Sequence, residues 1–236
     1  MEHLRSNRSR TPIRLAQGVQ AEFGLASALF ALAAAWAIVR PRLVSISLAG
    51  LLGLLWALLL RFFRDPERAP DLDEPDTVLS PADGRVVEIE PVHEPRFLTG
   101  DALKISIFMS LLDVHVNRAP LAGTVRLVEH VPGQFLQAHR KEASLVNEHN
   151  WIGLEGPYGR VLVNQIAGIM ARRIVCWAVP GQTLSQGERL GLIKFGSRVE
   201  VYLPITATAS IKEGEQVYAG KTVIAQLASA IPSDHP

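Results

Sequence analysis

Three short clusters of polar residues carry the side chains from which an active site could be built. Residues 80–84 (SPADG) place an aspartate before a glycine, residues 113–120 (DVHVNRAP) gather ionisable groups before a proline, and residues 195–198 (FGSR) contain a Gly-Ser step. The second cluster follows an apolar run, and loops that follow strands often hold catalytic side chains. A serine hydroxyl becomes a useful nucleophile when a neighbouring base takes its proton. Ser197 and His115 are therefore candidates for nucleophilic chemistry.

Each cluster taken alone also has a structural explanation. An aspartate before a glycine commonly hydrogen-bonds within its own turn. A single histidine at the end of a strand is more often structural than catalytic, and a Gly-Ser step between two apolar strands is typical of a bulge or a turn. The chemical interpretation depends on the combination of the three clusters, not on any one of them.

Several other kinds of site are not indicated by the sequence. It contains no GxGxxG, Walker A, HExxH or GxSxG motif, and its seven histidines are scattered along the chain. The one cysteine, Cys176, excludes an intramolecular disulfide and any metal site with several cysteines. The net charge of +1 provides no general field for nucleic acid. We therefore expect neither a bound metal nor a nucleic-acid partner.

Two uncharged runs near the N-terminus predict a membrane hairpin. They cover residues 23–39 and 43–60 and are separated by Arg40-Pro41-Arg42. Each run is just long enough to cross the ~30 Å apolar core of a bilayer as a helix. A buried helical hairpin in a soluble protein is the alternative, but buried helices rarely lack polar residues on every face. The two arginines of the turn leave open a shallow hairpin that enters and leaves one leaflet.

The arginines around this hairpin predict its orientation. They gather at its two outer ends, at Arg5, Arg8, Arg10 and Arg14 before it and at Arg61, Arg64 and Arg68 after it. Because positive charge is retained on the cytoplasmic side, we expect both ends at the cytoplasmic face of the cell membrane. The basic segment 1–22 precedes the hairpin region 23–60, and a charged, proline-rich linker follows over 61–76. Arginines of the linker could approach anionic lipid, at about 1 kcal/mol each.

Residues 77–236 form the third and largest region, which we expect to be a β-rich catalytic domain. Short apolar runs alternate there with Gly, Pro and Asp turns, as in β proteins. The expected strands are 84–90, 102–109, 123–131, 160–166, 173–178, 190–193, 198–202, 206–211 and 222–226, with a short helix within 135–147. The turn and strand rhythm of 183–193 and 211–225 resembles the flattened barrel-sandwich of lipoyl and biotinyl domains. The predicted fold class is therefore mainly β, a barrel-sandwich-like domain preceded by an N-terminal α-helical membrane hairpin.

The three clusters, in this order and behind a membrane segment, resemble the phosphatidylserine decarboxylases, most closely the short bacterial and archaeal branch. The resemblance covers most of 61–236 and is most specific over 187–201 (GERLGLIKFGSRVEV). Members of this family are made as proenzymes. The resemblance implies that the Ser197 hydroxyl attacks the Gly196 carbonyl, so that the chain divides into a β chain, 1–196, and an α chain, 197–236. The α chain would begin with a pyruvoyl group derived from Ser197, the only cofactor, and would stay paired with the β chain.

The resemblance also implies roles for other residues. His115 would be the base that activates Ser197 and the acid that later protonates the product carbon, and Asp83 would orient His115 as in hydrolase triads. Larger members carry a second histidine three residues further on, where this chain has Arg118. Either His115 serves both steps or another group such as His139 contributes. Arg118 and His139 are also candidates for binding the substrate.

The implied reaction is the decarboxylation of phosphatidylserine in the membrane to phosphatidylethanolamine and CO2, through a Schiff base between the pyruvoyl group and the substrate amine. Higher oligomers of the paired chains are left open. Two other functions fit the same residues. One is a membrane-anchored carrier or binding module with a lipoyl-like barrel and no catalysis. The other is a membrane-anchored hydrolase that uses Ser197 and His115 directly, and both alternatives predict an intact chain.

Overall fold

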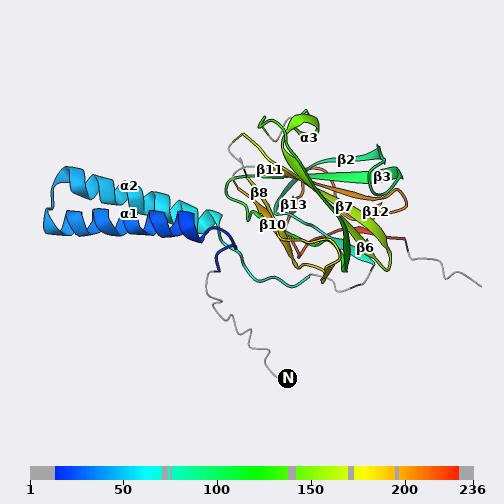
Figure 1. Ribbon diagram of the computed structural model, residues 1–236, viewed down its shortest axis with the longest axis horizontal. Coiled ribbons are helices and arrows are strands. Elements are labelled where there is room, and N and C mark those ends of the chain that lie inside the picture. Colours follow the sequence, from blue (N-terminus) through cyan, green and yellow to red (C-terminus); the bar gives the residue numbers. More distant parts are fainter. Residues whose placement is uncertain are drawn as a thin grey trace, which may run out of the picture. The chain divides into compact units, whose positions relative to one another are not determined.

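The computed structural model describes residues 14–70, 74, 76–137, 142–169, 173–194 and 197–228. The chain divides into two compact units, Met1–Glu67 and Arg68–Pro236. The first contains two helices and the second contains the β-strands (Figure 1). This arrangement confirms the predicted fold class, a mainly β domain behind a helical hairpin.

The first unit is a hairpin of two long apolar helices, α1 (Gln20–Val39) and α2 (Leu43–Phe62). Each helix is long and apolar enough to cross a membrane. Most of their large apolar side chains are exposed, which is the distribution expected of helices that face lipid. The turn between them is closed by Ser45, whose hydroxyl donates a hydrogen bond of 2.7 Å to the carbonyl oxygen of Arg40. The exposed apolar sides of the two helices are compatible with a hairpin that lies in a membrane.

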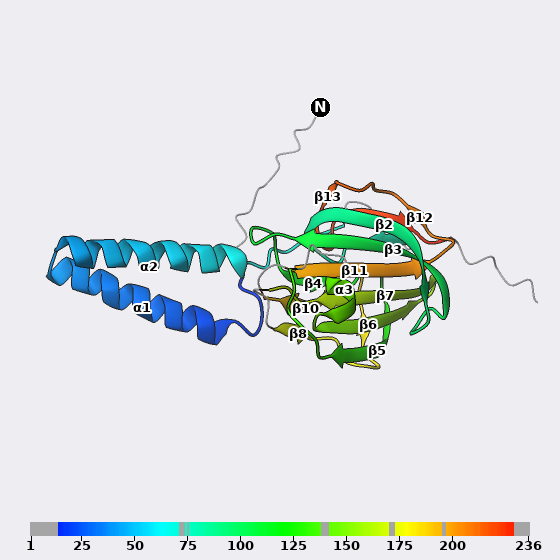
Figure 2. The same cartoon turned by 90° about the horizontal axis from the view of Figure 1, so that it is seen from above.

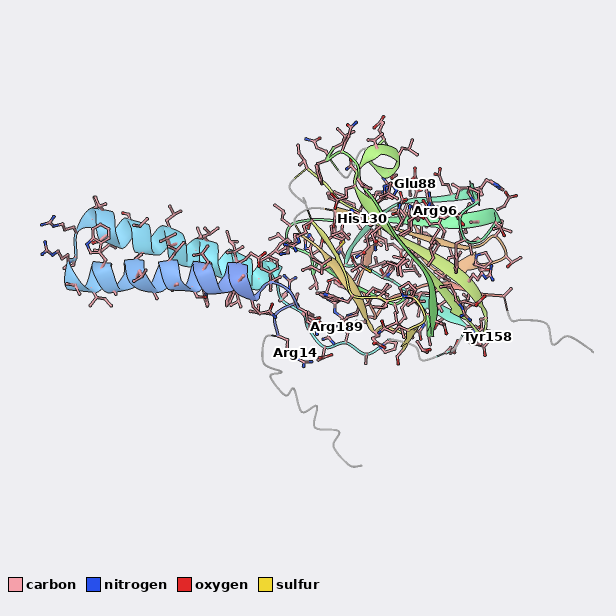
Figure 3. The ribbon with its side chains drawn as sticks, viewed as in Figure 1. Arg14, Glu88, Arg96, His130, Tyr158 and Arg189 are labelled. Carbon is pink, nitrogen blue, oxygen red and sulfur yellow. The ribbon has the colours of Figure 1, made fainter. Side chains whose placement is uncertain are left out.

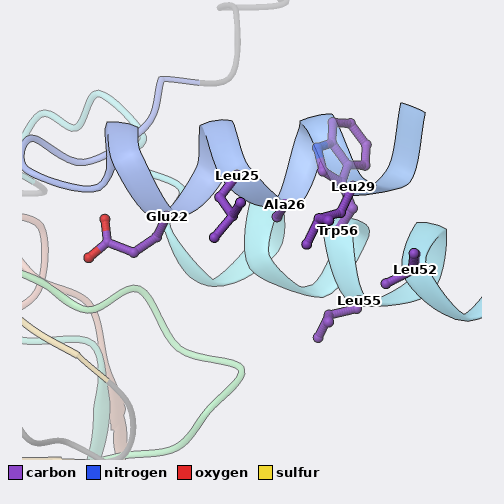
Figure 4. A pocket seen from close by; sticks show the side chains of 7 residues that line it. All are labelled: Glu22, Leu25, Ala26, Leu29, Leu52, Leu55 and Trp56. Carbon is purple, nitrogen blue, oxygen red and sulfur yellow. The ribbon is translucent and has the colours of Figure 1, made fainter. Parts of the chain in front are cut away.

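Aromatic packing and a partly buried hydrogen bond join the two helices. The Trp56 ring lies 5.6 Å from the Phe23 ring and 6.0 Å from the Phe30 ring, measured between centroids. Its indole N–H donates a hydrogen bond of 2.9 Å to the Ser27 hydroxyl. A hydrogen bond between helices satisfies polar groups that lipid cannot satisfy. A shallow groove beside this contact is lined by Glu22, Leu25, Ala26, Leu29, Leu52, Leu55 and Trp56 (Figure 4).

The described residues of the second unit form fourteen strands and one short helix. In chain order they are β1 (Thr77–Leu79), β2 (Gly84–Glu94), β3 (Gly100–Met109), β4 (Val116–Arg118), β5 (Gly123–Val131), α3 (Ala143–Val146), β6 (His149–Gly156), β7 (Gly159–Ile166), β8 (Ile174–Cys176), β9 (Thr183–Leu184), β10 (Arg189–Ile193), β11 (Ser197–Pro204), β12 (Thr208–Ala209), β13 (Gln216–Val217) and β14 (Val223–Gln226). They form an eight-stranded sheet in the order β13-β2-β3-β11-β7-β6-β5-β9 and two three-stranded sheets, β1-β14-β12 and β4-β10-β8. The large sheet curls into a half-barrel, which is visible when Figures 1 and 2 are compared.

The two faces of the large sheet differ because side chains alternate along each strand. One face packs into the core with Ile105, Ile107, Val163, Val199 and Val201, all fully buried. The residues between them on β11 and its neighbours are polar, and they include Arg198, Glu200 and Ser106. The sheet is therefore apolar toward the core and carries charges on its other face.

Each of the nine expected strands overlaps an observed strand. Two of the strands that the sequence did not indicate, β6 and β4, have features that conceal them. β6 is interrupted by glycines, and at Gly153 a Cβ atom would lie 2.8 Å from the Phe97 ring, so the glycine leaves room for that ring. β4 is short and ends with Asn117 and Arg118, which conceals it in a sequence read for apolar runs. The helix expected within 135–147 is α3, which has only four residues.

The strand register brings the ends of several strands together at one end of the large sheet. We call this part of the sheet the Ser197 end. Ser197, the first residue of β11, pairs with Met109, the last residue of β3. The next residue, Arg198, pairs with Ile166 at the end of β7, and Ile166 pairs with His149 at the start of β6. The loops that follow β3 and β7 and the loop that precedes β6 therefore leave the sheet close to Ser197.

Candidate active site

Ser197 lies in the interior of the second unit, on the core-facing side of β11. Its side chain is fully buried, and its hydroxyl donates a hydrogen bond of 3.2 Å to the sulfur of Met109. A thioether is a weak acceptor and does not remove a proton. The hydroxyl therefore rests against Met109 and must turn toward a base before it can react. Gly196, the other half of the expected cleavage site, lies outside the described residues.

His115 is fully buried and directly precedes β4. Its Nδ1 lies 3.0 Å from the carbonyl oxygen of Asp113. Because a carbonyl oxygen only accepts, Nδ1 carries the hydrogen in this contact, and Nε2 is the basic nitrogen of the neutral ring. The backbone N–H of Ile193 donates to the carbonyl oxygen of His115, and Ile193 comes four residues before Ser197. The predicted base and nucleophile therefore lie on neighbouring segments.

A row of buried amides extends from the Ser197 contact into the core. The Asn117 amide nitrogen lies 3.8 Å from the same Met109 sulfur, and its amide oxygen accepts a hydrogen bond of 2.8 Å from Gln165. Asn150 in turn donates to Gln165 at 3.0 Å. All three amides are at most 2% exposed. Such groups are kept in a core only when they are hydrogen-bonded, and together they fix Met109 and the strand that follows His115.

Sequence reasoning missed Gln165 and Asn150 as parts of the site. The available signal was weak, namely an Asn-Gln pair directly after the apolar residues 161–163 of β7. Their partners come from β4, β6 and β7, so only the folded arrangement joins them to Ser197. Asn117 belongs to the cluster 113–120, whose ionisable residues rather than this amide indicate a site in the sequence.

Asp83 is buried but makes different contacts from those expected. Its two carboxylate oxygens accept hydrogen bonds from both terminal nitrogens of Arg68, one of them at 2.7 Å, and from the backbone N–H of Ala219 at 2.8 Å. The contact with His115 that a triad would require is not among these bonds. Arg68 therefore pairs with Asp83, which differs from the expectation that linker arginines approach lipid. The role of Asp83 beside His115 stays a prediction.

Gly84, next to Asp83, is required by close packing. A Cβ atom at this position would lie 2.2 Å from the carbonyl oxygen of Phe108. The glycine thus allows the start of β2 to approach the end of β3. The Asp83 turn is consequently held against the Ser197 end of the sheet.

The two expected substrate-binding residues remain untested. Arg118 is 5% exposed, and its guanidinium donates a hydrogen bond of 2.9 Å to the carbonyl oxygen of Gly187. As the neighbour of Asn117 on β4, it points to the opposite side of that strand. His139 lies outside the described residues. Substrate binding by either side chain therefore stays a prediction.

A charge cluster of four residues, Glu88, Lys104, Arg198 and Glu200, occupies the other side of β11. The Arg198 guanidinium lies 2.8 Å from Glu88 and 3.1 Å from Glu200. Lys104 lies 3.1 Å from Glu88. Glu88, labelled in Figure 3, and Lys104 precede the expected cleavage position, whereas Arg198 and Glu200 follow it. The cluster therefore joins the two segments that cleavage would separate.

The surroundings of the charge cluster shift the pKa of its member Lys104 and of the neighbouring Tyr202. Burial lowers the pKa of Lys104, but hydrogen bonds to Glu90 and Glu88 outweigh that effect and leave the pKa raised. Burial and the adjacent Glu200 carboxylate raise the pKa of Tyr202, so its hydroxyl stays protonated and donates to Glu200 at 2.7 Å. The Ser144 hydroxyl of α3 donates to the other Glu200 oxygen at 2.6 Å. Each carboxylate oxygen of Glu200 thus accepts a hydrogen bond from a hydroxyl group.

Two other kinds of chemistry find little support in the described part of the chain. It contains no group of three or more His, Cys, Asp or Glu side chains arranged to hold a metal ion. Burial raises the pKa of the Cys176 thiol, which keeps it in the protonated, unreactive form. Ser197 and His115 therefore remain the best candidates for nucleophile and base.

Comparison with known proteins gives a consistent result. A family model described as phosphatidylserine decarboxylase matches residues 55–225. Relatives named phosphatidylserine decarboxylase proenzyme include one from Ralstonia nicotianae, 49% identical over 175 residues that make up 74% of this chain and 80% of the relative. Others come from Carboxydothermus hydrogenoformans, 47% identical over 78% of this chain and 87% of the relative, and Symbiobacterium thermophilum, 50% identical over 76% and 82%. The matched region includes all three polar clusters.

Proposed function

The chain belongs to the phosphatidylserine decarboxylase family, and we propose that its decarboxylase activity depends on a pyruvoyl group made from its own Ser197. The observation that carries this proposal is the position of Ser197 as the first residue of a central strand. All eight residues of β11, from Ser197 to Pro204, pair with β3, and Arg198 to Tyr202 also pair with β7. A cut before Ser197 would leave this pairing intact, so the new chain end would stay in the core.

The proposed self-cleavage begins with attack of the Ser197 oxygen on the Gly196 carbonyl carbon. The peptide C–N bond breaks as an ester forms, and the Ser197 nitrogen gains a proton. Elimination then removes the proton from the Ser197 Cα to a base and breaks the bond between the Ser197 Cβ and oxygen, which releases a carboxylate at Gly196 and leaves dehydroalanine. Water replaces the nitrogen of dehydroalanine, ammonia departs, and a pyruvoyl group remains at the start of the α chain.

His115 is the proposed base for the first step. The hydrogen bond from its Nδ1 to the Asp113 carbonyl presents Nε2 as the basic nitrogen. After the Ser197 hydroxyl turns away from Met109, Nε2 takes its proton and returns it to the departing nitrogen. A neutral imidazole suits both transfers because the ordinary pKa of histidine lies close to neutrality.

The surroundings of Ser197 fit a small, uncharged keto group. Ser197 shares its side of β11 with the thioether of Met109 and the amide of Asn117, neither of which is charged. The pyruvoyl carbonyl supplies an acceptor for the substrate amine and for the electron pair left when CO2 departs. His115 then donates the proton that the substrate carbon requires. The product is phosphatidylethanolamine.

After cleavage, the charge cluster would keep the α chain attached to the β chain. Arg198 follows the new terminus directly and is 2% exposed, and its partner Glu88 belongs to the β chain. Chain termini usually fray unless they are tied down. The ion pair and the two-sided strand pairing therefore hold the terminus of the α chain in register.

The proposed location is the cytoplasmic face of the cell membrane. The hairpin of α1 and α2 supports membrane anchoring through its length and composition. The arginines at its two outer ends support a cytoplasmic position for the β domain. The lipid substrate would then be present in the membrane that anchors the enzyme.

The decisive experiment is denaturing mass spectrometry of purified, folded protein. We expect two fragments divided between residues 196 and 197, with the smaller blocked to Edman degradation. Ser197→Ala should give one intact chain, whereas Ser210→Ala, at an exposed serine, should be cleaved normally. An intact wild-type chain would favour the carrier module or the hydrolase. Normal fragments from Ser197→Ala would instead show that an external protease makes the cut.

A further inference from the structure

Exposed apolar side chains gather on the loops at the Ser197 end of the large sheet. They form a rim, which consists of Leu111, Leu112, Leu145, Val146 and Ile169. Leu145 is 81% exposed and Ile169 is 54% exposed. Large apolar side chains that are exposed together usually mark a surface that contacts something else.

Strand register places the members of the rim around Ser197. Leu111 and Leu112 follow Met109, the residue paired with Ser197. Leu145 and Val146 belong to α3, just before β6, and Ile169 follows β7. Because the start of β6 and the end of β7 pair with each other and with the start of β11, all three loops leave the sheet at the same end.

The opposite end of the sheet has a different surface. Ile205, which follows β11 there, is 49% exposed. Near the turn between β6 and β7, Glu155 forms ion pairs with Arg126 at 2.7 Å and with Arg160 at 2.9 Å. Exposed ion pairs of this kind are well solvated by water and would be unfavourable in the apolar part of a bilayer. Exposed apolar side chains are therefore present at both ends, but at this end charged pairs lie near them, whereas the five members of the rim are grouped at the Ser197 end.

We propose that this rim inserts into the surface of a lipid bilayer and brings the Ser197 end of the sheet to the lipid headgroups. A bilayer is the occupant that fits, because the same chain carries a hairpin long and apolar enough to cross a membrane and belongs to a family named for a lipid substrate. The inference rests on the proposed function, since it assumes that the hairpin is in a membrane. It adds a second, separate contact between this enzyme and lipid.

The charges of the three loops indicate how the rim would bind. Residues 110–115, 132–148 and 167–173 contain four basic residues and three acidic ones, a net charge of +1. Attraction to anionic lipid is therefore weak, and insertion of apolar side chains provides the binding. The rim should consequently enter vesicles of zwitterionic phosphatidylcholine about as well as vesicles that contain phosphatidylglycerol.

Spin labels on the full chain test this proposal directly. Cys176→Ser removes the native thiol, after which Leu145→Cys or Ile205→Cys carries a nitroxide in protein reconstituted into phosphatidylcholine vesicles. Oxygen concentrates in the bilayer and a nickel chelate stays in water. We expect the oxygen-to-nickel accessibility ratio at 145 to be several-fold higher than at 205. Equal ratios would overturn the proposal, and so would dipolar broadening at 145, because it would show that a second copy of the chain covers the rim.

The same measurement separates this inference from the proposed function. Repeated with Ser197→Ala, it should give the same ratios, because the rim does not require cleavage. Failure of wild-type cleavage would defeat the pyruvoyl proposal and leave the label result valid. As a second variant, Leu111→Ser with Leu145→Ser should raise the KM for phosphatidylserine in mixed micelles several-fold while cleavage stays complete. Ile205→Ser should change neither, and an unchanged KM in the rim variant would contradict lipid insertion.

Discussion

Consecutive residues of β11 face two different environments. Ser197, Val199 and Val201 lie on the core side, where the neighbours of Ser197 are a thioether and buried amides. Arg198 and Glu200 lie on the other side, within the charge cluster. The alternation of a strand thus separates the residue expected to react from the residues expected to hold it.

This difference suggests a division of labour within one strand. Breaking a buried ion pair by removing one partner costs about 3–5 kcal/mol, so paired charges are suited to anchoring a cut chain. Uncharged polar groups, such as those near Ser197, can orient its hydroxyl and still leave the proton free to move to a base. We therefore expect changes on the core side to affect cleavage first and changes on the charged side to affect retention of the α chain. Three predictions test this contrast.

The largest effect is expected from His115→Ala, which should slow self-cleavage by about 10²–10⁴-fold, the range for loss of a general base. His149 is a matched control, because it is also buried and its Nδ1 lies 2.7 Å from the carbonyl oxygen of Asn147, again two residues earlier. His149 pairs with Ile166, which also pairs with Arg198. Its side chain therefore lies on the side of the large sheet that carries the charge cluster. His149→Ala should cleave at nearly the wild-type rate, as followed by denaturing electrophoresis. An equal reduction of the cleavage rate in both variants would mean that the two sides of β11 do not differ in their effect on cleavage.

A smaller effect, on the retention of the α chain, is expected from Glu88→Gln. It removes the charge that pairs with Arg198 across the cleavage position and should destabilise the cleaved enzyme by up to about 3 kcal/mol. Glu90→Gln is the control, because Glu90 also contacts Lys104 but is 40% exposed.

Hydrogen exchange measures the effect of Glu88→Gln. Amides of residues 198–204 should exchange faster in the cleaved variant and change little when Ser197→Ala keeps the chain intact. The Glu90→Gln variant should match the wild type in both backgrounds. Equal acceleration in the intact and cleaved forms would show a general packing role for Glu88 and remove the anchoring interpretation.

The smallest effect is expected from Gln165→Leu on the core side. It leaves the Asn117 oxygen without its donor, and an unsatisfied buried polar group costs about 1–3 kcal/mol. The cleavage rate should also fall somewhat. Asn117 contacts the Met109 sulfur, and the same sulfur accepts the hydrogen bond from the Ser197 hydroxyl, so a displaced Asn117 would disturb the position of Ser197. Gln226→Leu, at an exposed position of β14, is the control. Reduced thermal stability with an unchanged cleavage rate would limit the amide row to a structural role.

Local patterns allowed much of the fold to be predicted. The uncharged runs 23–39 and 43–60 became α1 and α2, because length and apolar composition suffice to define such helices. The strand 123–131 was predicted with its observed bounds. β4 and β6 were missed because their residues do not form continuous apolar runs. Contacts within the site could not be predicted from local patterns in the same way. The sequence around Asp83 indicated a turn, but it did not indicate that Asp83 pairs with Arg68.

The sequence by itself determined the family, the hairpin and the β-rich domain, because each follows from residues close together in the chain. Cleavage at the Gly196-Ser197 step stays a prediction. Only the tertiary structure decided that Ser197 rests on Met109, that Arg198 pairs with Glu88, and that an apolar rim surrounds this end of the sheet. The physical reason is strand register. A slip of one residue would move every side chain of β11 to the other face, and that register is set by pairing between distant segments.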